Sequence, residues 1–196
     1  MDPVDCIFID PARRDKHGKK TVQLSDCEPD ITQLEELLLE KASRVIIKLS
    51  PMLDISLALK DLKYGTQVHI LSVHNDCKEL LFVLDKSANA PVKLHCLNFT
   101  HNQPQEFIFT KEEEQDAYCE YTDQVCTYLS EPNASILKAG GYRSIAARYK
   151  LKKLHPNSHL YTSTEYLEEF PGRVFHVEAT APIKDKALLK GVDKAN

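Results

Sequence analysis

The chain has 196 residues, of which 42% are apolar and 28% are charged, with 25 basic and 29 acidic side chains. This balance is ordinary for one or two small globular domains, and it excludes an intrinsically disordered chain and a uniformly basic coat for nucleic acid. No segment approaches the roughly 18 uncharged apolar residues of a transmembrane helix, which excludes a helical membrane protein.

Strand-like and helix-like patterns alternate in the first half of the chain. Val4–Ile9 predicts a buried strand that ends before Asp10, and Ala12–Ser25 predicts a loop. Asp30 predicts the N-cap of a helix over Ile31–Ala42, where apolar residues recur at helical spacing. The next predicted elements are a strand, a helix and a strand, over Arg44–Leu49, Leu53–Leu62 and Val68–Val73. This alternation indicates a parallel α/β sheet that helices cover on both faces.

The second half begins with consecutive strands and then changes in composition. Strands are predicted at Leu80–Leu84, Val92–Phe99 and Glu106–Phe109, so we expect the sheet to finish in antiparallel hairpins. The charged run Lys111–Asp116 predicts a surface helix that continues to the region of Leu129. Residues 133–164 contain no acidic side chain, and the last predicted elements are a helix over Ser144–Leu154 and a strand over Arg173–Val177. We therefore expect one domain over residues 1–112 and a smaller α+β unit over residues 113–196.

Polar residues follow the first two predicted strands. Because open α/β sheets bind ligands outside the carboxyl ends of their strands, we expect Asp10 to face a crevice there. Its carboxylate could accept hydrogen bonds from an amine or a hydroxyl, while Arg13 and Arg14 could hold phosphates. The second strand ends in the same manner, and the residues that would line the same crevice are Lys48, Ser50 and Pro51. The alternative is a pair of strand-ending turns with solvated cations.

A basic block occupies residues 138–153, and His155, His159 and Tyr161 follow it. Such a block could neutralise the phosphates of a nucleic acid while the rings stack on bases, or it could be the solvated face of a basic helix. Gly140 and Gly141 indicate either a flexible turn or a close approach of the backbone. No predicted strand is followed by a glycine-rich nucleotide-binding turn.

Two long segments resemble one family of proteins. The run DCIFIDPARRDKHGKKTVQLSDCEPDI resembles the fourth-strand region of bacterial class I S-adenosylmethionine-dependent methyltransferases that carry a THUMP-like C-terminal domain. The run EPNASILKAGGYRSIAARYKLKKLHPNSHLYTS, followed by FPGRVF, resembles the C-terminal domain of the same family. The resemblance implies the second half of a Rossmann-like, seven-stranded methyltransferase sheet, followed by a small α+β THUMP-like domain.

The resemblance also implies roles for individual residues. Asp10 and Pro11 would be catalytic, because they would face the transferred methyl group and hold an acceptor amine in line with it. Ala12 and Arg13 stand where related amino-methylating enzymes have a second proline and an aromatic residue, so a target other than a base amine stays open. Ser50 stands where the RNA 5-methyluridine enzymes have a nucleophilic cysteine, which disfavours a covalent mechanism.

A THUMP-like domain implies RNA as a partner. The candidate RNA-binding residues are Lys138, Arg143, Lys150, Lys152, Lys153, His155 and Arg173. These residues would contact mainly the RNA backbone. S-adenosylmethionine is the implied cofactor. The glycine-rich turn and the acidic ribose-binding residue that would hold it would lie in a first half of the domain that this chain lacks. We therefore expect this chain alone to be inactive and to self-associate through an open sheet edge.

Two alternatives remain open at this stage. One is a stand-alone RNA-binding module without enzymatic activity. The other is a metal-assisted phosphoryl-transfer or hydrolytic enzyme that uses Asp10, Asp15 and His17, although the last two lie in a basic loop that disfavours a cation. The six cysteines form no CxxC pair and the N-terminus has no secretory signal pattern, so we expect reduced thiols, no structural metal and a cytoplasmic location.

Overall fold

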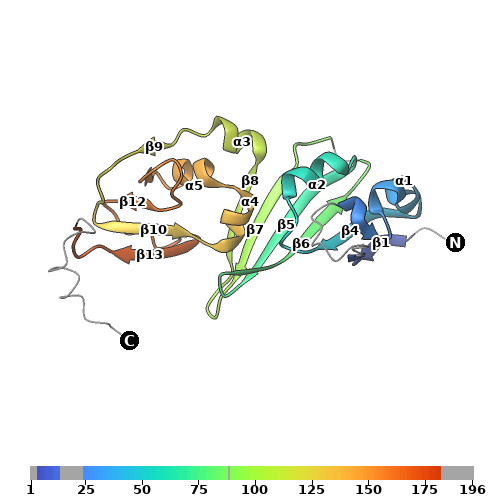
Figure 1. Ribbon diagram of the computed structural model, residues 1–196, viewed down its shortest axis with the longest axis horizontal. Coiled ribbons are helices and arrows are strands. Elements are labelled where there is room, and N and C mark those ends of the chain that lie inside the picture. The colour runs from blue at the N-terminus through green and yellow to red at the C-terminus, as the bar shows by residue number, and fades with distance from the viewer. Residues whose placement is uncertain (1–3, 14–23, 88, 182–196) are drawn as a thin grey trace.

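The structure, a computed structural model, describes residues 4–13, 24–87 and 89–181 (Figure 1). Two sheets lie side by side along the long axis of the molecule, with the N-terminal sheet on the right of the view and the C-terminal sheet on the left. A short two-stranded ladder, of β2 (Ala12–Arg13) and β3 (Cys27–Glu28), accompanies the first sheet. No helix among the described residues is long and apolar enough to cross a bilayer.

The first sheet contains six strands in the order β1-β4-β6-β5-β7-β8. Their bounds are β1 Val4–Ile9, β4 Ala42–Leu49, β5 Gly65–Val73, β6 Asp76–Leu84, β7 Lys93–Phe99 and β8 Gln105–Thr110. β1 pairs with β4 and β5 pairs with β7 in parallel, whereas the other three pairs are antiparallel. The expected parallel sheet is therefore mixed, and the expected antiparallel finish is confirmed.

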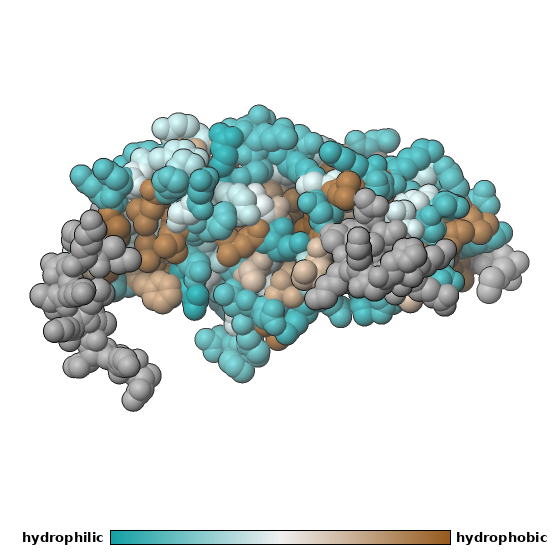
Figure 2. Space-filling view, in the orientation of Figure 1, coloured by the Kyte–Doolittle hydropathy of each residue, from teal (hydrophilic) through white to brown (hydrophobic). Residues whose placement is uncertain are grey.

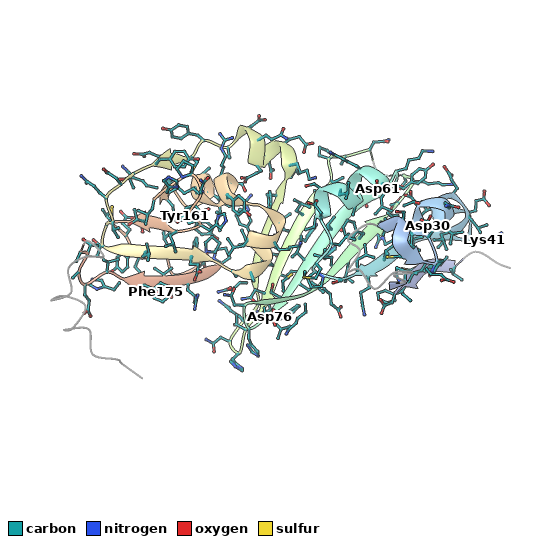
Figure 3. All side chains as sticks on the ribbon, viewed as in Figure 1. Asp30, Lys41, Asp61, Asp76, Tyr161 and Phe175 are labelled. Carbon is teal, nitrogen blue, oxygen red and sulfur yellow. The ribbon has the colours of Figure 1, made fainter. Side chains whose placement is uncertain are left out.

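A tight turn explains the reversal in the middle of this sheet. His74 and Asn75 both have positive φ, of 50° and 64°, which is the backbone of a two-residue hairpin turn. The turn sends β6 back between β4 and β5, so that β4 gains an antiparallel neighbour. Asp76 lies near the free end of this hairpin, at the bottom of the molecule (Figure 3).

Two predicted helices are confirmed in the first half. α1 (Ile31–Lys41) begins after Asp30, whose carboxylate accepts a hydrogen bond from the backbone N–H of Thr32. α2 (Ile55–Asp61) begins after Asp54, which accepts from the backbone N–H of Leu57. A 3-10 turn, Leu24–Asp26, precedes β3 in a region predicted as loop.

Both helices pack on one face of the first sheet. The residues of β4 that point to this face are Val45, Ile47 and Leu49, and all three are buried in the main core cluster. Ile136 joins the same cluster from α4 (Ala134–Ala139), which contacts β5, β6 and β7. The opposite face of the sheet contributes no member to this cluster among the described residues. The expectation of helices on both faces is therefore wrong for the described part of the chain.

Strand β1 is an edge strand and is largely exposed. Val4 is 48% exposed and Phe8 is 60% exposed, although the sequence predicts a buried strand here. The reason is that, within the described residues, β1 pairs only with β4, and Val4 and Phe8 point to the face of the sheet that the core cluster does not cover. An apolar strand that lies exposed at a sheet edge is a surface prone to pair with other polypeptide.

The second sheet has five short strands in the order β13-β10-β12-β11-β9. Their bounds are β9 Glu120–Tyr121, β10 Tyr128–Pro132, β11 Lys152–Lys153, β12 Tyr161–Ser163 and β13 Gly172–His176. The predicted last strand is thus confirmed as β13. Tyr161 is fully buried in this unit, and its hydroxyl donates a hydrogen bond to the carbonyl of Tyr142 (Figure 3).

Two helix predictions in this half are too long. α3 (Lys111–Asp116) ends well before Leu129, because the chain then extends to pair β9 with β11. α5 (Tyr142–Arg148) ends six residues before Leu154, because Lys150 adopts a left-handed backbone with φ of 54° and β11 follows. In both places, strand pairing with distant residues overrides the local helical pattern.

Candidate functional site

The carboxyl ends of β1 and β4 bring three charged residues together. The ammonium of Lys48 lies 2.6 Å from a carboxylate oxygen of Asp10 and 3.8 Å from one of Glu79. Lys48, Asp10 and Glu79 all lie on the face of the sheet that is opposite the core cluster. The side chains of Asp10, Lys48 and Glu79 are 55%, 31% and 44% exposed. We call these three residues the carboxyl-end cluster.

The cluster is partly solvated and accessible to a ligand. The Asp10 carboxylate, which accepts a hydrogen bond from Lys48, raises the pKa of that lysine, and the charge of Glu79 adds to the effect. Lys48 therefore stays protonated and holds the Asp10 carboxylate in one orientation. The predicted pairing of Asp10 with the end of the second strand is thus present in the structure.

The other residues predicted for this crevice have more local roles. The hydroxyl of Ser50 accepts a hydrogen bond from the backbone N–H of Met52, and the Ser50 carbonyl accepts one from Leu53, which shapes the turn into α2. Pro51 is half-buried in that turn and Pro11 is buried. Arg13 lies in β2, opposite Cys27. Arg14, Asp15 and His17 lie outside the described residues.

The uncovered face of the first sheet adjoins this cluster. Residues that point to it alternate with the core residues along each strand, and neighbours in register share a face. Its apolar members include Val4, Cys6, Phe8, Ile46, Leu71, Val73, Leu81, Val83, Leu97, Phe99 and Ile108. We call these residues the open face. Val83 is buried, the others are half-buried or exposed, and none of them belongs to the core cluster.

Two stacked histidines lie in the middle of the open face. His69 of β5 and His95 of β7 are in register, and their ring centroids are 4.5 Å apart. Burial lowers the pKa of both imidazoles, whereas the negative charge of Glu106 acts to raise both pKa values. Nε2 of His69 lies 3.2 Å from the side-chain oxygen of Gln67, whereas Nε2 of His95 is buried without a hydrogen-bond partner among the described residues.

The predicted RNA-binding residues are largely engaged within the protein. Lys152 forms an ion pair with Glu120, and Arg173 forms one with Glu131. The ammonium of Lys153 is buried and donates hydrogen bonds to the carbonyls of His155 and Pro156, and burial lowers the pKa of this lysine.

The remaining candidates are more open. Arg143 donates to the carbonyl of Gln115 but is exposed. Lys150 and His155 are exposed, and Lys138 is half-buried. The predicted residues do not form one patch, because Arg173 and Lys152 lie toward opposite edges of the second sheet.

A cavity of about 330 Å³ opens beside two of these lysines, Lys150 and Lys152. Several of the polar groups that line it are already bonded within the protein. The Thr162 hydroxyl donates to the carbonyl of Tyr128, the Ser163 hydroxyl donates to that of Glu165, and Lys152 is paired with Glu120. The cavity therefore offers few unsatisfied groups to a ligand.

The backbone at the start of α5 is also satisfied from within. The Glu114 carboxylate accepts hydrogen bonds from the backbone N–H groups of Tyr142, Arg143 and Ser144 and from the Ser144 hydroxyl. Gly140, with φ of 80°, ends α4, and a Cβ on Gly141 would lie 2.9 Å from the Phe109 ring. The two glycines thus serve one turn and one close approach, which were the alternatives inferred from the sequence.

Two features of the site were missed by the sequence analysis. Glu79 joins the carboxyl-end cluster only because β6 returns beside β4, and no local pattern predicts that strand order. The exposure of Phe8 was missed because an apolar strand has the same sequence pattern whether it is covered or not. The described residues also contain no group of three or more acidic, histidine or cysteine side chains arranged to hold a metal ion.

Comparison with known proteins gives two matches. Residues 128–171 match a family described as a ferredoxin-like domain, and they span β10 to β12 of the second sheet. Over its length the chain is similar to a crystal structure named "putative methyltransferase" from Porphyromonas gingivalis W83, with 38% sequence identity and a TM-score of 0.87. The match covers 95% of this chain but 46% of that one, so this chain spans less than half of the solved relative. No curated protein matches the chain.

Proposed function

We propose that this chain is the C-terminal half of an S-adenosylmethionine-dependent methyltransferase, and that the carboxyl-end cluster binds the methyl acceptor. The observation that carries the proposal is the position of Asp10 and Lys48 at the ends of two adjacent parallel strands. Open α/β sheets bind their ligands at such strand ends. The similarity to one half of a protein named as a methyltransferase supports the class of reaction.

The strand order supports the same proposal. A parallel pair, β1 and β4, is followed by β6, which runs in the opposite direction between β4 and β5. The sheet of class I methyltransferases, which the sequence resembles, also ends with one strand that runs against its parallel neighbours. The exposed edge of β1 is where the first half of such a sheet would pair.

The carboxyl-end cluster suits an acceptor amine. Asp10 would accept a hydrogen bond from the amine, while the ion pair with Lys48 holds the carboxylate in one orientation. The cofactor would supply an activated methyl group, and positive charge would develop on the acceptor nitrogen as it takes up that group. A carboxylate at that nitrogen stabilises the developing charge, and its fixed position aligns the acceptor.

The residues described here fit the acceptor side of the reaction and not the cofactor side. Within the described part of the chain, no strand of the first sheet leads into a glycine-rich turn that could approach a nucleotide. The sulfonium cofactor supplies the activated methyl group. We therefore assign its binding to a further polypeptide segment, of the kind that the solved relative carries in the rest of its length.

We propose that the methyl acceptor is part of an RNA, and that the second unit binds this RNA. The support is the acid-free stretch of residues 133–164 and the exposed side chains of Lys150 and His155. A base acceptor inside a duplex would have to be unstacked to reach Asp10. Because Lys152, Lys153 and Arg173 are engaged within the protein, the contact would depend on fewer cations than the sequence offers.

Cofactor binding by a chimera tests the main proposal. The chimera joins this chain to the part of the Porphyromonas gingivalis protein that it does not match. We expect calorimetry to detect S-adenosylmethionine binding by the chimera and none by the chain alone. A chimera that melts cooperatively but binds no cofactor would contradict the proposal.

The role of Asp10 is tested in the same chimera. Asp10→Asn should preserve cofactor binding and slow methyl transfer by roughly a hundredfold or more, because a neutral amide stabilises developing positive charge poorly. Asp5→Asn is the matched control, since Asp5 is an exposed acid on the same strand. If the two variants transfer methyl groups at equal rates, Asp10 is not the acceptor-binding group.

A further inference from the structure

We infer that Glu79 is a positioning residue, which takes over the ammonium of Lys48 when an acceptor amine binds Asp10. This inference rests on the proposed function, because it describes how the carboxyl-end cluster responds to the acceptor. Glu79 does not touch the acceptor and acts only through Lys48. Its effect is to leave the charge of Asp10 uncompensated when the acceptor nitrogen becomes positive.

The first argument is the arrangement of three adjacent strands. Lys48 lies on the central strand β4, Asp10 follows β1 on one side, and Glu79 lies on β6 on the other side. Leu81 is the residue of β6 in register with Lys48, so Glu79 is a diagonal neighbour of Lys48, within reach of a long side chain. The flexible four-carbon stem of Lys48 can therefore pivot between the two carboxylates without a change of the backbone.

The second argument is the pair of distances from the Lys48 ammonium. It lies 2.6 Å from a carboxylate oxygen of Asp10, to which it donates a hydrogen bond, and 3.8 Å from one of Glu79. Charge-assisted hydrogen bonds from nitrogen to oxygen are about 2.7–2.9 Å long, so a movement of about 1 Å bonds Lys48 to Glu79 instead. Both carboxylates are partly exposed, which leaves room for this movement.

The third argument is the balance of charge in the cluster. Asp10 and Lys48 alone form a neutral pair, so positive charge on an acceptor nitrogen meets the ammonium as well as the carboxylate. The repulsion between the two cations then offsets much of the attraction to Asp10. Glu79 gives the three side chains one excess negative charge. Once Lys48 is bonded to Glu79, the Asp10 carboxylate faces the acceptor alone.

Chemical labelling of the chain tests the movement of Lys48 without any methyl transfer. Acetic anhydride acylates the neutral, unbonded form of a lysine amine, and mass spectrometry follows the rate at Lys48. Because either carboxylate can hold the ammonium, Asp10→Asn and Glu79→Gln should each change this rate less than about threefold, whereas the double variant should raise it roughly tenfold or more. Lys150 is exposed and is the internal control, which should react equally in all four proteins.

Two labelling results would overturn the inference. If Asp10→Asn alone raises the rate at Lys48 as much as the double variant does, Glu79 does not take over the ammonium. If the double variant reacts at the wild-type rate, neither carboxylate holds Lys48.

Methyl-transfer kinetics of the chimera test what this movement does. Bulk bacterial RNA is the acceptor probe, and Glu79→Gln is measured alone and together with Lys48→Met. We expect Glu79→Gln alone to lower kcat roughly tenfold with little change in the KM for RNA, because the effect appears only as charge develops on the acceptor. In the Lys48→Met background, the same substitution should lower kcat less than about twofold, since no ammonium then has to move.

Asp76→Asn is the matched control, because Asp76 is an exposed acid of β6 that pairs with Lys78. It should change kcat less than about twofold. Far-ultraviolet circular dichroism and thermal melts would verify that every variant folds. An equal loss of kcat on Glu79→Gln in both backgrounds would also overturn the inference, because Glu79 would then act on the acceptor directly.

The two arms keep this inference separate from the proposed function. If the chimera transfers no methyl group, the proposed function fails, and the labelling rates of the chain alone still decide whether Glu79 takes over Lys48. If the chimera is active and the labelling rates contradict the movement, the inference fails and the proposed function stands.

Discussion

The two sheets of this protein differ in how far they satisfy their own surfaces. In the first sheet, within the part of the chain that the structure describes, β1 pairs with β4 alone, the open face lies outside the core cluster, and His95 has a buried nitrogen without a hydrogen-bond partner. In the second unit, the charged groups find partners nearby, as when the Glu114 carboxylate accepts four hydrogen bonds at the start of α5. Among the described residues, the first sheet thus leaves an edge and a face open, whereas charged groups of the second unit are paired, although Ser130 Oγ and His159 Nδ1 of that unit are also buried without a hydrogen-bond partner.

The surface of the molecule also differs between the two regions. Figure 2 shows hydrophobic residues on the viewed face over the second sheet, at the left, although most of the surface there is hydrophilic. Phe175 of β13 is one exposed aromatic side chain of this sheet, and it contacts the guanidinium of Arg173. Scattered exposed apolar residues of this kind are normal, whereas the open face of the first sheet gathers apolar residues from neighbouring strands, with Lys48 and Glu79 in register beside them.

A network of amides joins the two regions. Gln105 of β8 accepts hydrogen bonds from the side chains of Asn98 and Asn133 and donates one to the carbonyl of Gly172. Asn75 in the hairpin turn accepts a hydrogen bond from the backbone N–H of Ala134. Because these bonds connect the first sheet to α4 and β13, the second unit is held in a defined position at the end of the first sheet.

The largest expected loss of stability is at Gly172 of the second unit, and Gly140 of the same unit is the comparison. A Cβ on Gly172 would lie 2.1 Å from the carbonyl oxygen of Glu131, so Gly172→Ala must displace β13 from β10. We expect a loss of about 3–4 kcal/mol in unfolding free energy. Gly140→Ala should lose only about 1 kcal/mol, because its positive φ is strained for alanine but the space is open.

Urea denaturation followed by tyrosine fluorescence measures this difference. Of the eight tyrosines, only Tyr64 lies in the first sheet region, so the signal reports mainly on the second unit. Equal losses for the two glycine variants would contradict the close packing of β13 against β10.

The next effect tests whether the second unit satisfies itself through Glu114. Glu114→Ala removes the acceptor of four hydrogen bonds at the start of α5, and we expect a loss of about 2–3 kcal/mol in unfolding free energy. Glu112 is an exposed residue of α3, the helix that also carries Glu114, so Glu112→Ala should change the unfolding free energy by less than about 0.5 kcal/mol. Hydrogen exchange of the α5 amides would locate the loss. Unchanged protection in Glu114→Ala would show that the carboxylate does not hold this helix.

The histidine pair gives the first sheet a distinct dependence on pH. Burial lowers the pKa of His69 and His95 in the folded protein below the ordinary value of 6.5. Between the folded and ordinary pKa values, the unfolded chain binds more protons than the folded one. Stability therefore rises with pH through this window and is lost as the pH falls below 6.5.

Acidification separates these two histidines from exposed ones. Unfolding free energies measured between pH 7.5 and pH 5, roughly one unit or more either side of the ordinary histidine value, should decrease less steeply in His69→Gln and His95→Gln than in the wild-type chain. His155→Gln is the control, because His155 is exposed. The same slope in all three variants would show that the stacked pair does not couple to folding.

Local sequence patterns predicted most helices and strands but not which strands pair with one another. The cap at Asp30 and the apolar runs of β4, β5 and β7 were predicted correctly from neighbours in sequence, whereas the cap at Asp54 was not predicted. The pairing of β6 with β4, which brings Glu79 to Lys48, depends on residues far apart in sequence and could not be read in this way.

The basic block illustrates the same limit for the candidate site. Lys152 and Arg173 stand in or beyond an acid-free stretch, yet in three dimensions each pairs with a glutamate from outside it. Burial of Lys153 against two carbonyls was equally invisible, since nothing in its sequence context distinguishes it from Lys152. Charge counted along a chain therefore overstates the charge available to a partner.

The smallest expected effect concerns that ion pair. Lys152 and Glu120 are about half exposed, and exposed pairs of this kind contribute about 0–1 kcal/mol, so Lys152→Ala should leave the unfolding free energy almost unchanged. If RNA binds the second unit, Lys150→Ala should weaken RNA binding more than Lys152→Ala does, because Lys152 must first leave Glu120. Filter-binding with single-stranded RNA at two salt concentrations measures both losses, and affinity should fall as salt rises. Equal losses for the two variants would mean that the pair with Glu120 opens freely, and the contrast between the paired charges of the second unit and the open face of the first sheet would then rest on the buried contacts alone.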